Sequence, residues 1–291
     1  MGVFGNGYIL STRDEFTLDS QLVKEIDEFS KLMDAIDIVT ENSIILINET
    51  EEKKSLWEKI KGLWKKFTDA VKRLWNKIFH RKKANADKHK NLMDNADTSQ
   101  DVVEEETITV LDNSAYESIN KALDAISSSV GDILVGNKLS KLELTDDIVK
   151  AGEKADEAYN NLKEKCTVQL NRIDRTFTNV PKKLVIENIE KNYNLTKEYE
   201  DKILETYNKF TNIMGSIEAV IEHLGNEANK DLRNISLTRA YSNELRRAKG
   251  ITLFIMKFYK PVEDVEVGLN VKLAKYSKAV EEKENKEEDK K

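Results

Sequence analysis

Residues Lys53–Lys83 read KKSLWEKIKGLWKKFTDAVKRLWNKIFHRKK and contain all three tryptophans of the 291-residue chain. The apolar side chains in this stretch recur at steps of three and four residues, which is the spacing of one face of an α-helix. The stretch therefore predicts an amphipathic helix over about residues 53–82. The apolar positions are Leu56, Trp57, Ile60, Leu63, Trp64, Phe67, Val71, Leu74, Trp75 and Ile78.

The same stretch is strongly basic. Twelve lysines and arginines stand against Glu58 and Asp69, so its net charge is +10, whereas the whole chain carries −6 and the remainder about −16. A cationic helix with tryptophans, set in an acidic chain, indicates a surface that binds a partner. The residues expected to act electrostatically are Lys59, Lys61, Lys65, Lys66, Lys72, Arg73, Lys77, Arg81, Lys82 and Lys83.

The composition favours long helices that are exposed to solvent. Charged residues make up 34% of the chain and the apolar set 39%, and there are only two prolines. We therefore predict a mostly α-helical, elongated bundle of coiled-coil type, with a separate cationic helix and at most one short β pairing. The single cysteine, Cys166, excludes a disulfide within the chain and is expected to be a buried apolar residue.

Composition along the chain divides it into four expected parts. The first contains a predicted helix near residues 14–38 and an aliphatic run at 43–48, before the cationic helix. The second has almost no large apolar residues and changes from basic to acidic, which is typical of a linker. In chain order the parts are a helical segment at 1–83, a charged linker at 84–106, a helical bundle at 107–280 and a charged tail at 281–291.

Within the bundle we expect helices near residues 114–136, 145–177, 181–224 and 226–248. The third has an apolar heptad repeat, on whose seam Thr196 and Glu200 are polar exceptions. The segment 250–260 is rich in β-branched and aromatic residues and stops at Pro261. It fits either a strand paired with 44–47 or the start of a buried helix. The seam consists of Ile186, Ile189, Tyr193, Ile203, Tyr207, Phe210, Met214, Ile217, Ile221 and Leu224.

The sequence offers few groups for catalysis. Its three histidines, His80, His89 and His223, form no metal-binding pair, and a lone cysteine cannot complete a thiolate zinc site. No glycine-rich loop has the spacing of a nucleotide-binding motif. We therefore expect a protein that is not an enzyme and that holds neither cofactor nor metal.

Three interpretations of the cationic helix remain open. Its apolar face could dock into a groove of another helical protein, in a homo- or hetero-oligomer, or into the chain's own acidic bundle. Alternatively, it could lie in an anionic membrane interface and serve delivery or lysis. A weaker alternative is contact with nucleic acid, because base stacking needs exposed aromatics and here the aromatic and cationic faces point apart. The proposed partner-binding residues are Trp57, Ile60, Trp64, Phe67, Val71, Leu74, Trp75 and Ile78.

The runs Leu56–Phe67 and Trp75–Phe79 resemble the tryptophan-lysine helices of bacteriophage virion structural proteins from low-GC hosts. The resemblance covers about thirty residues, and the chain's bias toward Lys, Asn, Ile and Glu fits an AT-rich genome. It implies a repeated structural subunit of a head, neck or tail that contacts capsid or connector neighbours in a virion assembled in the host cytoplasm. The alternative location is the periphery of a membrane on the cytoplasmic side.

Overall fold

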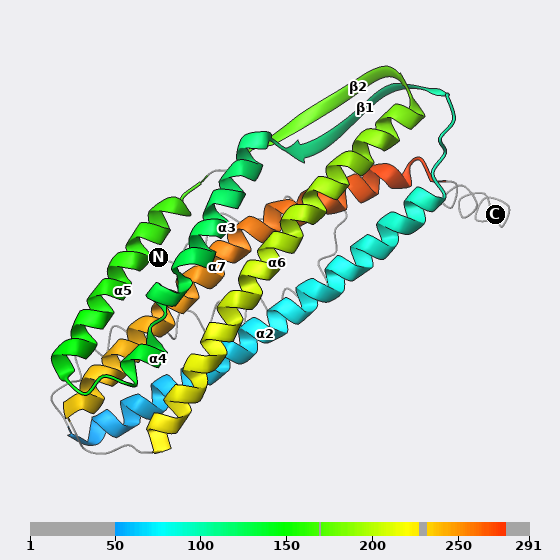
Figure 1. Ribbon diagram of the computed structural model, residues 1–291. Coiled ribbons are helices and arrows are strands. Elements are labelled where there is room, and N and C mark those ends of the chain that lie inside the picture. The colour runs from blue at the N-terminus through cyan, green and yellow to red at the C-terminus, as the bar shows by residue number, and fades with distance from the viewer. Residues whose placement is uncertain (1–49, 169, 227–231, 278–291) are drawn as a thin grey trace, which may run out of the picture. The chain divides into compact units, whose positions relative to one another are not determined.

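The computed structural model describes residues 50–168, 170–226 and 232–277, and this part of the chain is mostly α-helical with one two-stranded antiparallel sheet (Figure 1). The predicted fold class is therefore confirmed. The elements are α2 (Thr50–Asp94), β1 (Val102–Leu111), α3 (Asn113–Ile133), α4 (Gly136–Leu139), α5 (Thr145–Lys165), β2 (Arg172–Pro181), α6 (Lys182–Asn226) and α7 (Leu232–Ala274).

The chain forms two compact units, and each draws on several distant segments. Among the described residues, unit 1 holds 50–78, 131–157, 211–226 and 232–250, and unit 2 holds the rest. The helices α2, α6 and α7 each contribute to both units. The predicted division into 1–83 and 107–280 is thus not where the units divide, because the cationic helix packs together with the later helices instead of standing apart.

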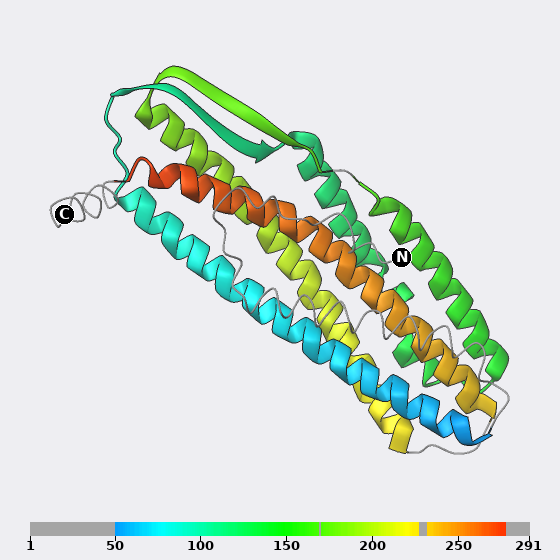
Figure 2. The ribbon, with the colours of Figure 1, turned by 180° about the vertical axis from the view of Figure 1, so that it is seen from behind.

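Unit 1 is arranged around the first part of α7, one of the three long helices. In both views α7 lies between α2 and α5, and α6 runs in the opposite direction to α7 (Figures 1 and 2). The core side chains come from α2, from the end of α6 and from the start of α7, which explains why none of these amphipathic segments stands alone. Fully buried residues of this core include Ile60, Trp64, Phe67, Val71, Met214, Ile217, Tyr241 and Leu245.

Unit 2 contains the sheet. Strands β1 and β2 pair antiparallel from Val102 opposite Pro181 to Leu111 opposite Arg172. Ile108 and Val110 on β1 are fully buried, whereas β2 is largely exposed. The sheet therefore covers a part of the helical core of unit 2 mainly through β1.

The charged linker predicted at residues 84–106 is wrong. Helix α2 continues to Asp94, and β1 begins at Val102. The helix here buries His89 as well as Leu92, and His89 forms a hydrogen bond with Asn270 of α7. A search for apolar periodicity misses a helix that buries polar side chains.

The helix predicted over residues 145–177 is wrong in its last part. Helix α5 ends at Lys165, and residues from Arg172 onward form β2. Ile173 and Phe177, which suggested a helical stripe, are four residues apart. Residues at that separation share a face in a strand as well as in a helix, so their spacing could not distinguish the two.

The segment 250–260 is helical throughout, and α7 continues beyond Pro261 to Ala274. This excludes its pairing as a strand, and Ile251, Ile255 and Phe258 are fully buried in the helix. The predicted helix at 14–38, the run at 43–48 and the tail at 281–291 lie outside the described residues.

The heptad seam of α6 is confirmed. Its apolar residues from Ile186 to Ile221 are buried, and Leu224 is half-buried. The two polar exceptions, Thr196 and Glu200, are buried on the same seam, as their register predicts. A carboxylate at such a position has to be accommodated by partners from neighbouring helices.

Candidate docking helix

Helix α2 turns its tryptophan face inward. The eight residues proposed to bind a partner are all buried by the protein's own chain, with Trp57 8% and Trp64 0% exposed. Each tryptophan can bury about 150–250 Å², so this face supplies much of the core of unit 1. The face is therefore an internal packing surface in this structure, which matches the alternative of docking into the chain's own bundle and leaves no open tryptophan face for a neighbouring subunit.

Two tryptophans of this face contact α7 directly. The Nε1 of Trp64 donates a hydrogen bond to the carbonyl oxygen of Tyr241 at 3.2 Å. The ring of Trp57 meets that of Tyr241 edge to face, with 5.9 Å between centroids. Trp57 also lies against Gly225 of α6, where a Cβ would come within 2.7 Å of the indole nitrogen. The tryptophan face is thus fitted closely to both neighbouring helices.

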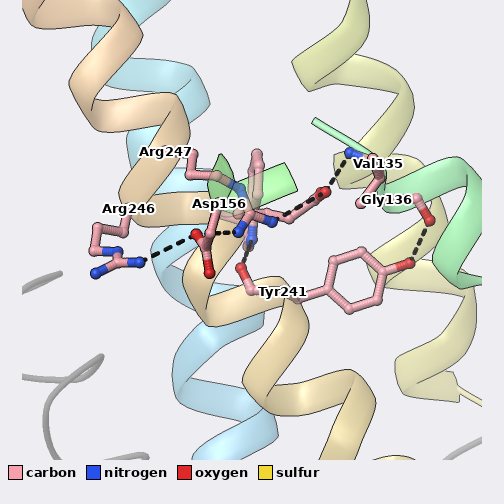
Figure 3. Close-up of polar contacts among 8 residues, drawn as sticks. Val135, Gly136, Asp156, Tyr241, Arg246 and Arg247 are labelled. Carbon is pink, nitrogen blue, oxygen red and sulfur yellow. Dashed lines mark hydrogen bonds and ion pairs between the residues drawn. The ribbon is translucent and has the colours of Figure 1, made fainter. Parts of the chain in front are cut away.

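A buried polar cluster continues from Tyr241 on the far side of α7 (Figure 3). The hydroxyl of Tyr241 donates to the carbonyl oxygen of Gly136 at 2.9 Å, and the amide of Val135 donates to the carboxylate of Glu244. Arg247 donates to Asp156 at 2.8 Å. These contacts tie the α3–α4 junction and α5 to α7.

Glu244 and Arg247 are both fully buried, and their charged groups are 3.6 Å apart. Burial raises the pKa of the Glu244 carboxyl to about 7, against the opposing effects of Arg247 and of the amides of Val135 and Gly136. Glu244 follows Tyr241 by three residues and so occupies a position on the apolar stripe of α7. A glutamate on the apolar stripe of a helix is the sequence signal that could have revealed this cluster.

The outer face of α2 in unit 1 is cationic. Lys59, Lys65, Lys66, Lys72 and Arg73 are exposed, while Lys61 and Lys77 are half-buried. None of the other residues that the structure describes forms an ion pair with Lys65, Lys66 or Lys72. The charges of these three lysines are therefore not neutralised by ion pairs within the described part of the chain.

The basic residues of α2 in unit 2 have a different role. Arg81 pairs with buried Glu263 at 3.3 Å, and Lys82 pairs with Glu200 at 3.5 Å and with Asp201. These two cations, predicted to act on a partner, act largely inside their own unit; Lys83 remains exposed.

Burial and, to a smaller extent, the nearby Glu266 together raise the pKa of the Glu200 carboxyl to about 8, while Lys82 opposes the shift. His89, two turns after Lys82 on α2, stacks on Tyr193 with 3.4 Å between ring centroids and binds the amide oxygen of Asn270 at 2.7 Å. Because that oxygen can only accept, His89 Nδ1 carries the proton. Burial lowers the pKa of His89.

Comparison of the chain with protein-family models, with curated proteins and with solved structures gives no match. Among the described helices, none has the length and apolarity that crossing a bilayer requires. Within the same residues, no group of three or more His, Cys, Asp or Glu side chains is arranged to hold a metal ion.

Proposed function

We propose that this protein is a non-enzymatic structural protein that joins a larger assembly by docking the basic outer face of α2 onto an acidic surface of a neighbouring protein subunit. The basic outer face is defined as Lys59, Lys65, Lys66, Lys72 and Arg73. The observation that carries the proposal is the difference in burial between the two faces of α2: the tryptophans are buried and the lysines of the basic outer face are exposed.

The burial of the tryptophan face fixes the position of the basic face before any partner binds. Trp57 and Trp64 hold the helix against α6 and α7, so its lysines project from a fixed backbone. A partner that meets a fixed surface has less conformational entropy to remove on binding. Charge then contributes chiefly to orientation and to the rate of encounter.

The charge of the whole chain favours a protein partner over an extended polyanion. Outside the stretch Lys53–Lys83 the chain carries about −16. A membrane or a nucleic acid presents many negative charges over a wide area and is repelled by that remainder, whereas an acidic patch on a protein can meet the basic face alone.

Insertion into a membrane has a further obstacle. An interfacial helix places its apolar face among the lipid headgroups, but here that face contacts Tyr241 and Gly225. Without leaving the bundle, α2 cannot offer a membrane its tryptophan face. The resemblance to virion structural helices also supports a structural role, and we propose a virion as the assembly.

Site-specific photo-crosslinking tests the proposal. A photoreactive residue replaces Lys65 or Lys72 in the full chain, and a matched variant carries it at Lys191, an exposed position on α6 of unit 2. In producing cells we expect the α2 positions, and not position 191, to form a protein conjugate of defined mass. Crosslinking to lipid or nucleic acid alone, or equal labelling from position 191, overturns the proposal.

A further inference from the structure

The outer face of α5 carries exposed carboxylates, which the basic face of α2 lacks. Asp146, Glu153 and Glu157 are exposed and follow one side of the helix at steps of seven and four residues, with the exposed lysines Lys150 and Lys154 beside them. None of the described residues forms an ion pair with these three carboxylates. We call Asp146, Glu153 and Glu157 the acidic ridge.

The acidic ridge also carries exposed apolar surface. Leu144 is 65% exposed and Val149 is 47% exposed, and they are the large hydrophobic side chains that unit 1 leaves open among its described residues. Val149 lies within one turn of both Asp146 and Glu153. Apolar residues surrounded by charge are the composition of an interface core with a polar rim, so this observation points to a protein partner independently of the charge pattern.

The spacing of the two faces agrees. Lys65 and Lys72 are seven residues apart on α2, and Asp146 and Glu153 are seven residues apart on α5. Seven residues of α-helix span about 10.5 Å. Two carboxylates of the ridge can therefore face two lysines of the basic face at the same time when the helices lie side by side.

The two faces cannot meet within one copy of unit 1. Helix α7 lies between α2 and α5 (Figure 2). It contacts α2 through the backbone carbonyl of Tyr241 and α5 through the side chain of Arg247. The basic face and the acidic ridge thus belong to helices on opposite sides of α7.

From this arrangement we infer that the acidic surface recognised by the basic face of α2 is the acidic ridge of α5 on a second copy of this chain. The inference rests on the proposed function and names its partner. Because the two surfaces differ, the contact is heterologous, and repetition of it adds copies in a row or a ring. Exposed ion pairs contribute about 0–1 kcal/mol each, so the association is weak for one contact and sensitive to salt.

Charge exchange tests this inference with two variants of the full chain. The first carries Lys65→Glu, Lys66→Glu and Lys72→Glu, and the second carries Asp146→Lys, Glu153→Lys and Glu157→Lys. Light scattering at low salt should show association of the wild type, which added salt reverses. Each variant alone should stay monomeric, because its two faces then carry the same charge. An equimolar mixture of the two should associate again, because each altered face meets its opposite.

A third variant carries Lys88→Glu, Lys90→Glu and Lys191→Glu at exposed positions of unit 2. Its net charge changes as much as that of the first variant, and it should associate like the wild type. Circular dichroism checks that each variant folds. A monomeric wild type at low salt, or a mixture that fails to associate although both variants fold, overturns the inference. If in addition Lys65 crosslinks to a different protein, the proposed function stands and only the identity of the partner is wrong.

Discussion

The indole of Trp64 and the backbone of Tyr241 are joined by a hydrogen bond of 3.2 Å from Nε1 to the carbonyl oxygen. Tyr241 in turn donates from its hydroxyl to Gly136 at 2.9 Å. One residue of α7 thus fixes both the tryptophan face of α2 and the start of α4. The docking proposal depends on this link, because it keeps the indoles inside and the lysines outside.

Replacement of Trp64 measures how strongly this link holds the helix. Trp64→Ala should lower the free energy of unfolding by about 3–5 kcal/mol, because a large buried side chain is removed. Trp64→Phe keeps most of the ring and should cost less, including about 1 kcal/mol for the hydrogen bond. Urea unfolding measures both. Lys65 follows Trp64 and is exposed, so Lys65→Ala should change the free energy of unfolding by less than about 0.5 kcal/mol.

Gly136 is required where the polar cluster meets α6. An added Cβ would lie 2.7 Å from a carboxylate oxygen of Glu244 and 2.9 Å from the side chain of Ile217, both fully buried. We expect Gly136→Ala to lower the free energy of unfolding by about 1–3 kcal/mol through overpacking. Gly152→Ala is the matched control. Gly152 lies inside α5 with open space around its Cα, so alanine there should stabilise by up to about 1 kcal/mol.

If Gly136→Ala were as stable as the wild type, the close fit of Glu244 over the α3–α4 junction would be contradicted. The same experiment bears on α5, because Asp156 reaches Arg247 beside this junction.

Apolar periodicity predicted the helices whose cores are apolar and missed the places where polar groups are buried. The seam of α6 and the tryptophan face of α2 follow simple steps of three and four, and both are found as predicted. The end of α2 was missed because His89 is held by Asn270 and by a stacked Tyr193, which no apolar pattern reveals.

The start of β1 was missed for a similar reason. Glu106 appears in the sequence as one of three consecutive glutamates, which suggested a solvated linker. In the structure it is buried and receives hydrogen bonds from Lys272, Lys275 and Tyr276. Those donors lie more than 160 residues away in the chain, so only tertiary structure brings them to the carboxylate.

The tryptophan face of α2 was predicted to bind either a partner or the chain's own bundle, and in the structure it packs inside the chain. The sequence shows that α2 is amphipathic, and amphipathicity alone does not say whether the apolar face packs inside the same chain or on another one. The acidic ridge of α5 was not recognised, because its three carboxylates are interleaved in the sequence with Lys150 and Lys154.

Glu200 should make stability depend on pH. Its folded pKa of about 8 lies above the ordinary value of 4.5, so between these values the folded state binds a proton that the unfolded state releases. The stabilisation is fully present below about pH 4.5 and is lost as pH rises toward 8. We expect Glu200→Gln, which has no proton to lose, to be more stable than the wild type at pH 8 by a few kcal/mol.

Urea unfolding of both proteins across this range measures the difference directly. The curves should converge near pH 4.5 and separate as pH rises. Asp201→Asn is the control, because Asp201 also pairs with Lys82 but has an exposed side chain. A difference between the Glu200 variant and the wild type that is constant with pH contradicts the raised pKa.

Cys166 should be unreactive in the folded protein. Its side chain is 1% exposed, and burial raises the pKa of the thiol to about 11, although Lys257 opposes this shift. Because the thiolate is the reactive form, an aromatic disulfide reagent at pH 8 should react about a thousandfold more slowly with the native chain than with the urea-unfolded chain, as expected when reaction requires opening of the structure. In a Cys166→Ala background, Ser128→Cys places a thiol at an exposed position of α3, and it should react at nearly the unfolded rate. Comparable rates for native Cys166 and this control would show that unit 2 opens readily around α5, which its buried thiol and hydrogen-bonded surroundings argue against.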